Sequence, residues 1–157
     1  MVKRILTAIV IVSLLLVAGC SGAGGSSDSA SYEILKKVEL ASKWRMCQVR
    51  LEIPSGAELP LLLKLADGDK VDGYFNLEAG AKLEFSISGN SQLYKSAVQE
   101  AASGKTISDR FSFTASQAQG NMYVLTFRNG DKKEGASVFL EVISPISAPI
   151  FVPLESK

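Results

Sequence analysis

The feature of this chain that most constrains its fold is a strict alternation of apolar and polar residues. In Cys47-Gln-Val-Arg-Leu-Glu-Ile53 every second residue is apolar, and the segment stops at Pro54-Ser-Gly56. A period of two is typical of a β-strand with one face buried and the other in water. Turn residues separate further segments of this kind, at 71–77, 83–87, 111–113, 123–127, 138–142 and 150–152. The pattern predicts an all-β fold, an antiparallel β-sandwich of the jelly-roll kind.

Three stretches leave alternatives open, and one turn is predicted. Residues 32–40 fit a short helix or a first strand, and residues 92–102 fit a weak helix or a long excursion between strands. A strand at 58–65 requires Pro60 to lie at a sheet edge or a strand start. That strand would bury four leucines on one face, Leu59, Leu61, Leu63 and Leu65. Asn129-Gly130 predicts a positive-φ hairpin turn before the last long strand.

The first twenty residues predict a secretory signal that ends in a lipid anchor. Lys3 and Arg4 precede a largely apolar stretch at 5–18, whose 14 residues are too few to cross a bilayer as a helix. Val17-Ala18-Gly19-Cys20 resembles a bacterial lipobox. The resemblance implies that Cys20 is acylated, with palmitate among its chains, and becomes the first residue of the mature protein.

These features predict three parts in the chain. We expect residues 1–19 to be the lipoprotein signal peptide, 20–31 the lipidated cysteine with a flexible Gly/Ser-rich tether, and 32–157 the β-sandwich domain. Two or more acyl chains hold a protein stably on a membrane. We therefore expect the protein at the cell membrane or envelope, anchored by its lipid on the extracytoplasmic face.

Composition narrows the function classes. The sequence contains no histidine, which excludes Ser-His-Asp and Cys-His nucleophiles and His-containing zinc sites. It has 17 basic and 16 acidic side chains, and loss of Lys3 and Arg4 with the signal changes the net charge from +1 to −1. A nearly neutral chain without a basic stripe argues against nucleic acid as a partner. Carboxylate pairs that include Glu84 or Glu141 are poor candidates for glycoside hydrolysis, because both residues alternate with core positions and should face water.

The second half of the chain contains strand and loop motifs in a recognisable order. They are Leu83-Glu-Phe-Ser-Ile87, a loop with Leu93-Tyr94, Ser108-Asp-Arg-Phe-Ser-Phe-Thr-Ala115, Tyr123-Val-Leu-Thr-Phe-Arg-Asn129 and Val138-Phe-Leu-Glu-Val142. With the earlier Leu65-Ala-Asp-Gly-Asp-Lys-Val-Asp-Gly-Tyr-Phe75, this order resembles the GOLD (Golgi-dynamics) domain, a β-sandwich module of secretory cargo receptors with relatives in bacterial envelope proteins. The resemblance implies the fold and a habit of protein or lipid interaction, and it nominates no catalytic residue. The family's disulfide is not carried over, because position 125 is leucine.

Cys47 is the second of only two cysteines. With Cys20 acylated, it has no partner for an intramolecular disulfide. Its phase with Val49 and Leu51 predicts a thiol packed inside as a small hydrophobe.

Two groups of residues are candidate binding sites. Asp67, Asp69 and Asp72 place three carboxylates close together, which suits calcium. Val71 and Asp72 depart from the EF-hand pattern, so an ordinary Gly-containing turn is the alternative. The second group consists of aromatic residues that lie out of phase with the core or in a loop, Trp44, Tyr74 and Tyr94.

We therefore expect a non-catalytic, lipid-anchored envelope protein that acts as a protein-interaction module. The alternative is a carbohydrate-binding or calcium-stabilised accessory module of an extracellular system. In either case the expected partners of the protein are the membrane, through the lipid, and a protein or a glycan. We expect no cofactor apart from the covalent lipid on Cys20, with calcium as the alternative.

Overall fold

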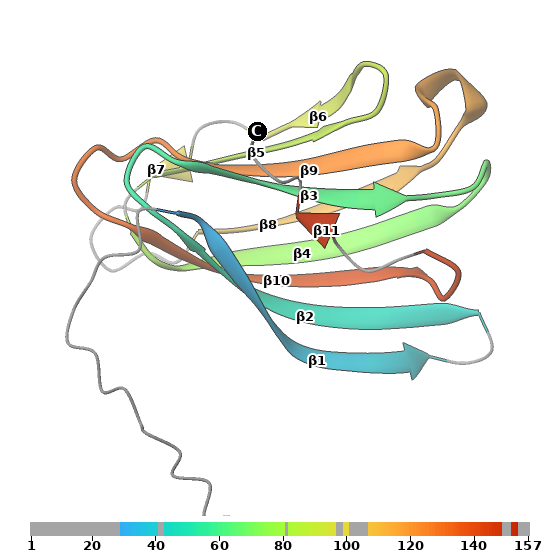
Figure 1. Ribbon diagram of the computed structural model, residues 1–157, viewed down its shortest axis with the longest axis horizontal. Helices are drawn as coiled ribbons and strands as arrows, with labels where there is room; N and C mark the ends of the chain where they lie inside the picture. The colour runs from blue at the N-terminus through green and yellow to red at the C-terminus, as the bar shows by residue number, and fades with distance from the viewer. Residues whose placement is uncertain are drawn as a thin grey trace, which may run out of the picture.

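The computed structural model describes residues 29–40, 43–80, 82–96, 99–100, 107–148 and 152–153. Two antiparallel sheets are stacked face to face, so the predicted all-β sandwich is confirmed (Figure 1). In spatial order, the first sheet, sheet A, contains β1 (Ser31–Leu40), β2 (Trp44–Ile53), β10 (Ala136–Pro145), β4 (Lys70–Ala79) and β8 (Ile107–Thr114). The second, sheet B, contains β11 (Val152–Pro153), β3 (Glu58–Lys64), β9 (Met122–Asn129), β5 (Lys82–Ser88) and β6 (Gln92–Lys95).

Two short elements complete the described structure. β7 (Gln99–Glu100) pairs with β5 beside β6, and a 3₁₀ turn, η1 (Gln117–Gln119), follows β8. No helix among the described residues has the length and hydropathy needed to cross a membrane.

The core lies between the sheets and follows the alternation in the sequence. The alternating apolar residues of β2 from Cys47 to Ile53 are buried, and the four leucines at 59, 61, 63 and 65 are buried as predicted. Phe75 of sheet A contacts two rings of sheet B, with centroid distances of 5.0 Å to Phe85 and 5.6 Å to Phe127. Aromatic rings dominate a core of this kind because each removes a large apolar area from water.

The structure resolves the stretches that the sequence left open. Residues 32–40 belong to strand β1, which pairs along β2 with a bulge between Ile34 and Lys36. The helical alternative for 92–102 is wrong where the chain is described, because β6 and β7 both pair with β5. Pro60 lies in β3, beside the two-residue strand β11.

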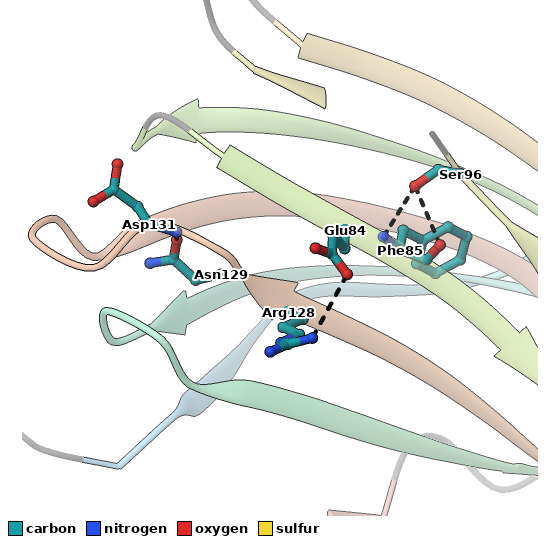
Figure 2. A network of polar contacts seen from close by, with 6 residues as sticks. All are labelled: Glu84, Phe85, Ser96, Arg128, Asn129 and Asp131. Carbon is teal, nitrogen blue, oxygen red and sulfur yellow. Dashed lines mark hydrogen bonds and ion pairs between the residues drawn. The ribbon is translucent and has the colours of Figure 1, made fainter. Parts of the chain in front are cut away.

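After β6, Ser96 continues the bonding to β5. Its backbone N–H donates to the Phe85 carbonyl (2.8 Å). Its Oγ accepts from the Phe85 N–H (3.0 Å) and donates to the same carbonyl (3.2 Å) (Figure 2). A hydroxyl thus supplies a ladder bond where the strand has ended.

The prediction of a tight positive-φ turn at Asn129-Gly130 is wrong. The φ of Gly130 is not in the positive region, and Asn129 is a fully buried strand residue. Its Nδ2 donates to the carbonyls of Ile53, Pro54 and Glu134, and its Oδ1 accepts from the Asp131 N–H. The buried amide therefore organises a longer loop, residues 130–135, between β9 and β10 (Figure 2).

Candidate binding groove on sheet A

A groove of about 830 Å³ lies on the outer face of sheet A, the face turned away from sheet B. The strands β2, β10, β4 and β8 all contribute to it. Its polar and aromatic side chains include Gln48, Glu141, Tyr74, Arg110, Asp72 and Phe139.

Strand register aligns four of these residues in one row. Gln48 lies opposite Glu141, Glu141 opposite Tyr74, and Tyr74 opposite Arg110. Neighbouring strands lie about 4.8 Å apart, so the row is a continuous line of side chains across four strands. We call this line the polar row. Its members come from distant parts of the sequence.

Contacts within the polar row fix its side chains. Gln48 Nε2 donates to Glu141 Oε2 over 2.7 Å. The Arg110 guanidinium carbon lies 6.0 Å from the centre of the half-buried Tyr74 ring, at the limit of a cation–π contact. The guanidinium thus lies over one face of the ring, and Glu141 is the neighbour of Tyr74 on the opposite strand.

Asp72 lies beside the polar row and has two partners. A hydrogen bond from the Ser112 hydroxyl is the main cause that lowers the pKa of Asp72, and Lys70 adds to the effect. The Lys70 ammonium lies 3.3 Å from its carboxylate. Asp72 therefore presents an ionised carboxylate, which only accepts hydrogen bonds.

Gly73 shapes the floor of the groove. A side chain at this position would overlap the ring of Phe111, which lies opposite it in β8. The missing side chain lets the Phe111 ring lie against the backbone of β4.

The other two candidate aromatics lie outside the groove. Trp44 is half-buried at the start of β2, and the strand alternation puts it on the face of Gln48, four residues away. Tyr94 of β6 donates its hydroxyl to Asp109 Oδ2 of β8 (2.8 Å), so it joins the two sheets. That hydrogen bond, together with burial, raises the pKa of Tyr94.

The three candidate metal ligands are not brought together. Asp69 Oδ2 accepts from the Ala66 N–H (2.7 Å) within a turn where Gly68 has a φ of 81°. Asp67 Oδ1 accepts from the Gln117 N–H (2.9 Å), whereas Asp72 lies in the groove of sheet A. Within the described part of the chain, no group of three acidic or cysteine side chains is arranged to hold a metal ion.

The structure describes one of the two cysteines, Cys47. Cys47 is buried, and burial raises the pKa of its thiol. This agrees with its predicted place in the core. Cys20 lies outside the described residues.

Sequence reasoning selected Tyr74 but missed Arg110 and Gln48 as its companions. The usable signal was that Arg110 and Gln48 both alternate with core residues, which places them on an outer face. The order of strands that brings them beside Tyr74 leaves no mark on the local pattern.

Neither a family model nor a curated protein sequence matches this chain. It is similar to a solved structure titled "CBM4 structure and function", at 11% identity over 73% of this chain and 77% of that chain, with a TM-score of 0.39. It is also similar to the CBM22-1 xylan-binding domain of Paenibacillus barcinonensis Xyn10C, at 15% identity over 78% of this chain and 89% of that chain, with a TM-score of 0.33. At this level the likeness concerns the β-sandwich fold alone.

Proposed function

We propose that this chain is a lipid-anchored, non-catalytic envelope module that binds a glycan in the groove of sheet A. One observation carries the proposal: the Tyr74 ring lies within a row of planar hydrogen-bonding groups on an open sheet face. A pyranose ring has C–H groups on its face and hydroxyls around its edge. An aromatic ring suits the first, and carboxylate, amide and guanidinium groups suit the second.

The polar row is prepared for such a ligand. Gln48 holds Glu141 in place, so little side-chain entropy is lost when Glu141 accepts a sugar hydroxyl. Asp72 is held by Ser112 and Lys70 in the same way. Fixed acceptors beside a stacking ring, Glu141 on the neighbouring strand and Asp72 two residues earlier on β4, favour binding in one orientation.

The charge state of Asp72 supports binding rather than hydrolysis. A glycosidase needs a carboxylic acid whose pKa is raised, so that it can protonate the leaving oxygen. The pKa of Asp72 is lowered instead. An ionised Asp72 can accept hydrogen bonds from hydroxyls but has no proton to give.

The proposed anchor is compatible with an open groove. Ser31 begins β1 and pairs with Glu52 near the end of β2, next to the loop at 54–57. A tether from Cys20 would therefore join the sandwich at one end of its strands. The groove lies on the side of sheet A, so a membrane below that end would leave it accessible.

A protein partner is the second candidate function, in line with the resemblance to the GOLD family. β1 is an edge strand that exposes two large apolar side chains, Ile34 (46%) and Leu35 (39%). An exposed edge can accept a strand from another protein. However, a bulge and Lys36 interrupt this edge, and both are features that hinder strand pairing.

A glycan array with the full chain in detergent tests the proposed function. We expect saturable binding that Tyr74→Ala weakens about tenfold, the loss expected for one aromatic contact, while Tyr74→Phe retains it. Met122→Ala, on the exposed side of sheet B, is the matched control and should bind like the wild type. Absence of glycan binding, or equal binding by a folded Tyr74→Ala protein, would refute the proposal.

A further inference from the structure

We infer that the glycan bound in the groove is acidic, and that a uronate carboxylate binds the Arg110 guanidinium at the β8 end of the polar row. This inference rests on the proposed function and names the chemical class of its ligand. It starts from a cation that has no carboxylate partner among the residues described.

Arg110 differs from the other arginines that lie on the outer sheet faces. Arg50 forms an ion pair with Glu78 (3.2 Å), and Arg128 lies 3.9 Å from Glu84. Arg110 is exposed and lines the groove, and it forms no ion pair within the described part of the chain. Its neighbour Asp109 alternates to the inner side, where its carboxylate accepts the Tyr94 hydroxyl.

The acidic side chains of the groove have polar partners other than Arg110. Glu141 accepts from Gln48, and Asp72 is paired with Lys70 and Ser112. Glu141 and Arg110 lie on either side of Tyr74, two strands apart, which is about 9–10 Å between backbones. This separation is about one Debye length at physiological salt, so Glu141 only weakly repels an anion bound at Arg110.

The geometry suits a uronic acid stacked on Tyr74. The carboxylate of such a sugar projects from the edge of the ring, and its hydroxyls project from the other edges. With the carboxylate at Arg110, the opposite hydroxyls lie toward Glu141 and Gln48. The guanidinium fork matches a carboxylate with two parallel hydrogen bonds, which an ammonium group cannot reproduce.

The polar row has a second cation at its other end. Lys36 of β1 lies opposite Gln48, is exposed, and forms no ion pair among the residues that the structure describes. The strand spacing of about 4.8 Å is close to the rise per sugar of an extended polysaccharide. A polyuronate lying across the strands would therefore meet a cation at each end of the row.

The test compares polyuronates with their own neutral forms. The probes are polygalacturonate, alginate, hyaluronan and glucuronoxylan, each as prepared and after chemical reduction of its carboxylates, together with neutral xylan and polyglutamate. With the full chain, we expect at least one polyuronate to bind about tenfold more tightly than its reduced form. Arg110→Gln should remove most of that preference and leave only what Lys36 contributes, Arg110→Lys should retain more of it, and the matched charge change Arg50→Gln should leave it intact.

The outcomes separate the inference from the proposed function. Equal binding of acidic and reduced polymers, lost in Tyr74→Ala, would overturn the inference and leave the proposed function standing. A preference that is undiminished in Arg110→Gln, or polyglutamate that competes as well as polyuronate, would also overturn the inference. If none of these polymers binds, the inference is wrong, and the glycan array decides the proposed function separately.

Discussion

Replacing Asn129 by alanine should destabilise the fold strongly, although the residue lies far from the groove. Asn129 is fully buried, and its amide makes four hydrogen bonds to backbone groups. The shortest of them is the 2.7 Å bond from Nδ2 to the Glu134 carbonyl. Its bonds to Ile53 and Pro54 join the end of β9 to the end of β2.

The magnitude follows from the groups left without partners. Asn129→Ala removes its amide from the Ile53 and Glu134 carbonyls and from the Asp131 N–H, whereas the Pro54 carbonyl keeps its bond from the Ala57 N–H. Each buried group left without a partner costs about 1–3 kcal/mol. Water reaches part of this surface loop once it relaxes, so we expect a loss of about 2–4 kcal/mol in the free energy of unfolding. That is a large share of the roughly 5–15 kcal/mol that stabilises a typical domain.

Urea unfolding followed by circular dichroism measures the effect. Asn90→Ala is the matched control, because the exposed Asn90 amide donates one hydrogen bond, to Ala118. It should cost less than about 1 kcal/mol. If Asn129→Ala unfolds within about 1 kcal/mol of Asn90→Ala, the amide does not organise the loop and the reasoning fails.

Asn129→Asp tests whether the stability of the fold rises or falls with pH. It keeps the acceptor for the Asp131 N–H but turns a carboxylate toward three carbonyls, which raises the pKa of the new carboxyl above that of the unfolded chain. A raised pKa contributes stability at low pH that is lost as pH rises through the folded value. The variant should therefore be least stable above its raised pKa, and a variant that gains stability toward neutral pH would contradict the assignment.

Four further predictions concern the groove floor, the loop, the metal and the anchor. Gly73→Ala should lower the free energy of unfolding in urea by about 1–3 kcal/mol, because the new methyl group displaces the Phe111 ring. Gly135→Ala should be tolerated, because the nearest atom to the new methyl group is 3.7 Å away. Equal losses of stability in the two variants would argue against the close approach of Phe111 to Gly73. The N–H groups of Lys133 and Glu134 lower the pKa of Asp131 below its ordinary 3.8, so its contribution holds above that pH and is lost as pH falls through the lower folded value. Wild type should accordingly lose stability more steeply in acid than Asp131→Asn, and parallel pH profiles would count against this. If calcium bound by Asp67 and Asp69 stabilises the domain, excess chelator should lower the melting temperature, and an unchanged value would refute the calcium alternative. Cys20→Ala should abolish palmitate labelling, and labelling that persists would refute the lipid anchor.

Local patterns in the sequence predict the long central strands and their buried faces, but they leave β1, β6 and β7 open. The alternation from Cys47 to Ile53 and the four leucines of β3 predicted which side chains enter the core, because successive side chains of a strand point to opposite faces. The absence of histidine limits the possible chemistry whatever the fold, because no arrangement of strands can supply a missing imidazole. Tyr74 was selected as a binding candidate for a local reason as well, its place out of phase with the core.

Local patterns misled where a single side chain acts over a long distance. Asn129-Gly130 has the composition of a tight turn, but the Asn129 amide bonds a carbonyl 76 residues away and opens a longer loop. Tyr94 has the sequence context of an exposed loop aromatic, and its hydrogen bond to Asp109 instead joins the two sheets. Neither partner is recognisable without knowing which loops and edges meet.

The groove itself was decided only by the tertiary structure. Gln48, Glu141, Tyr74 and Arg110 belong to four strands, and they become neighbours because β10 pairs between β2 and β4 and because β8 pairs with β4. The pattern of each strand determines which face a side chain occupies. Strand order and register determine what lies beside it, and these depend on how the two sheets pack as a whole.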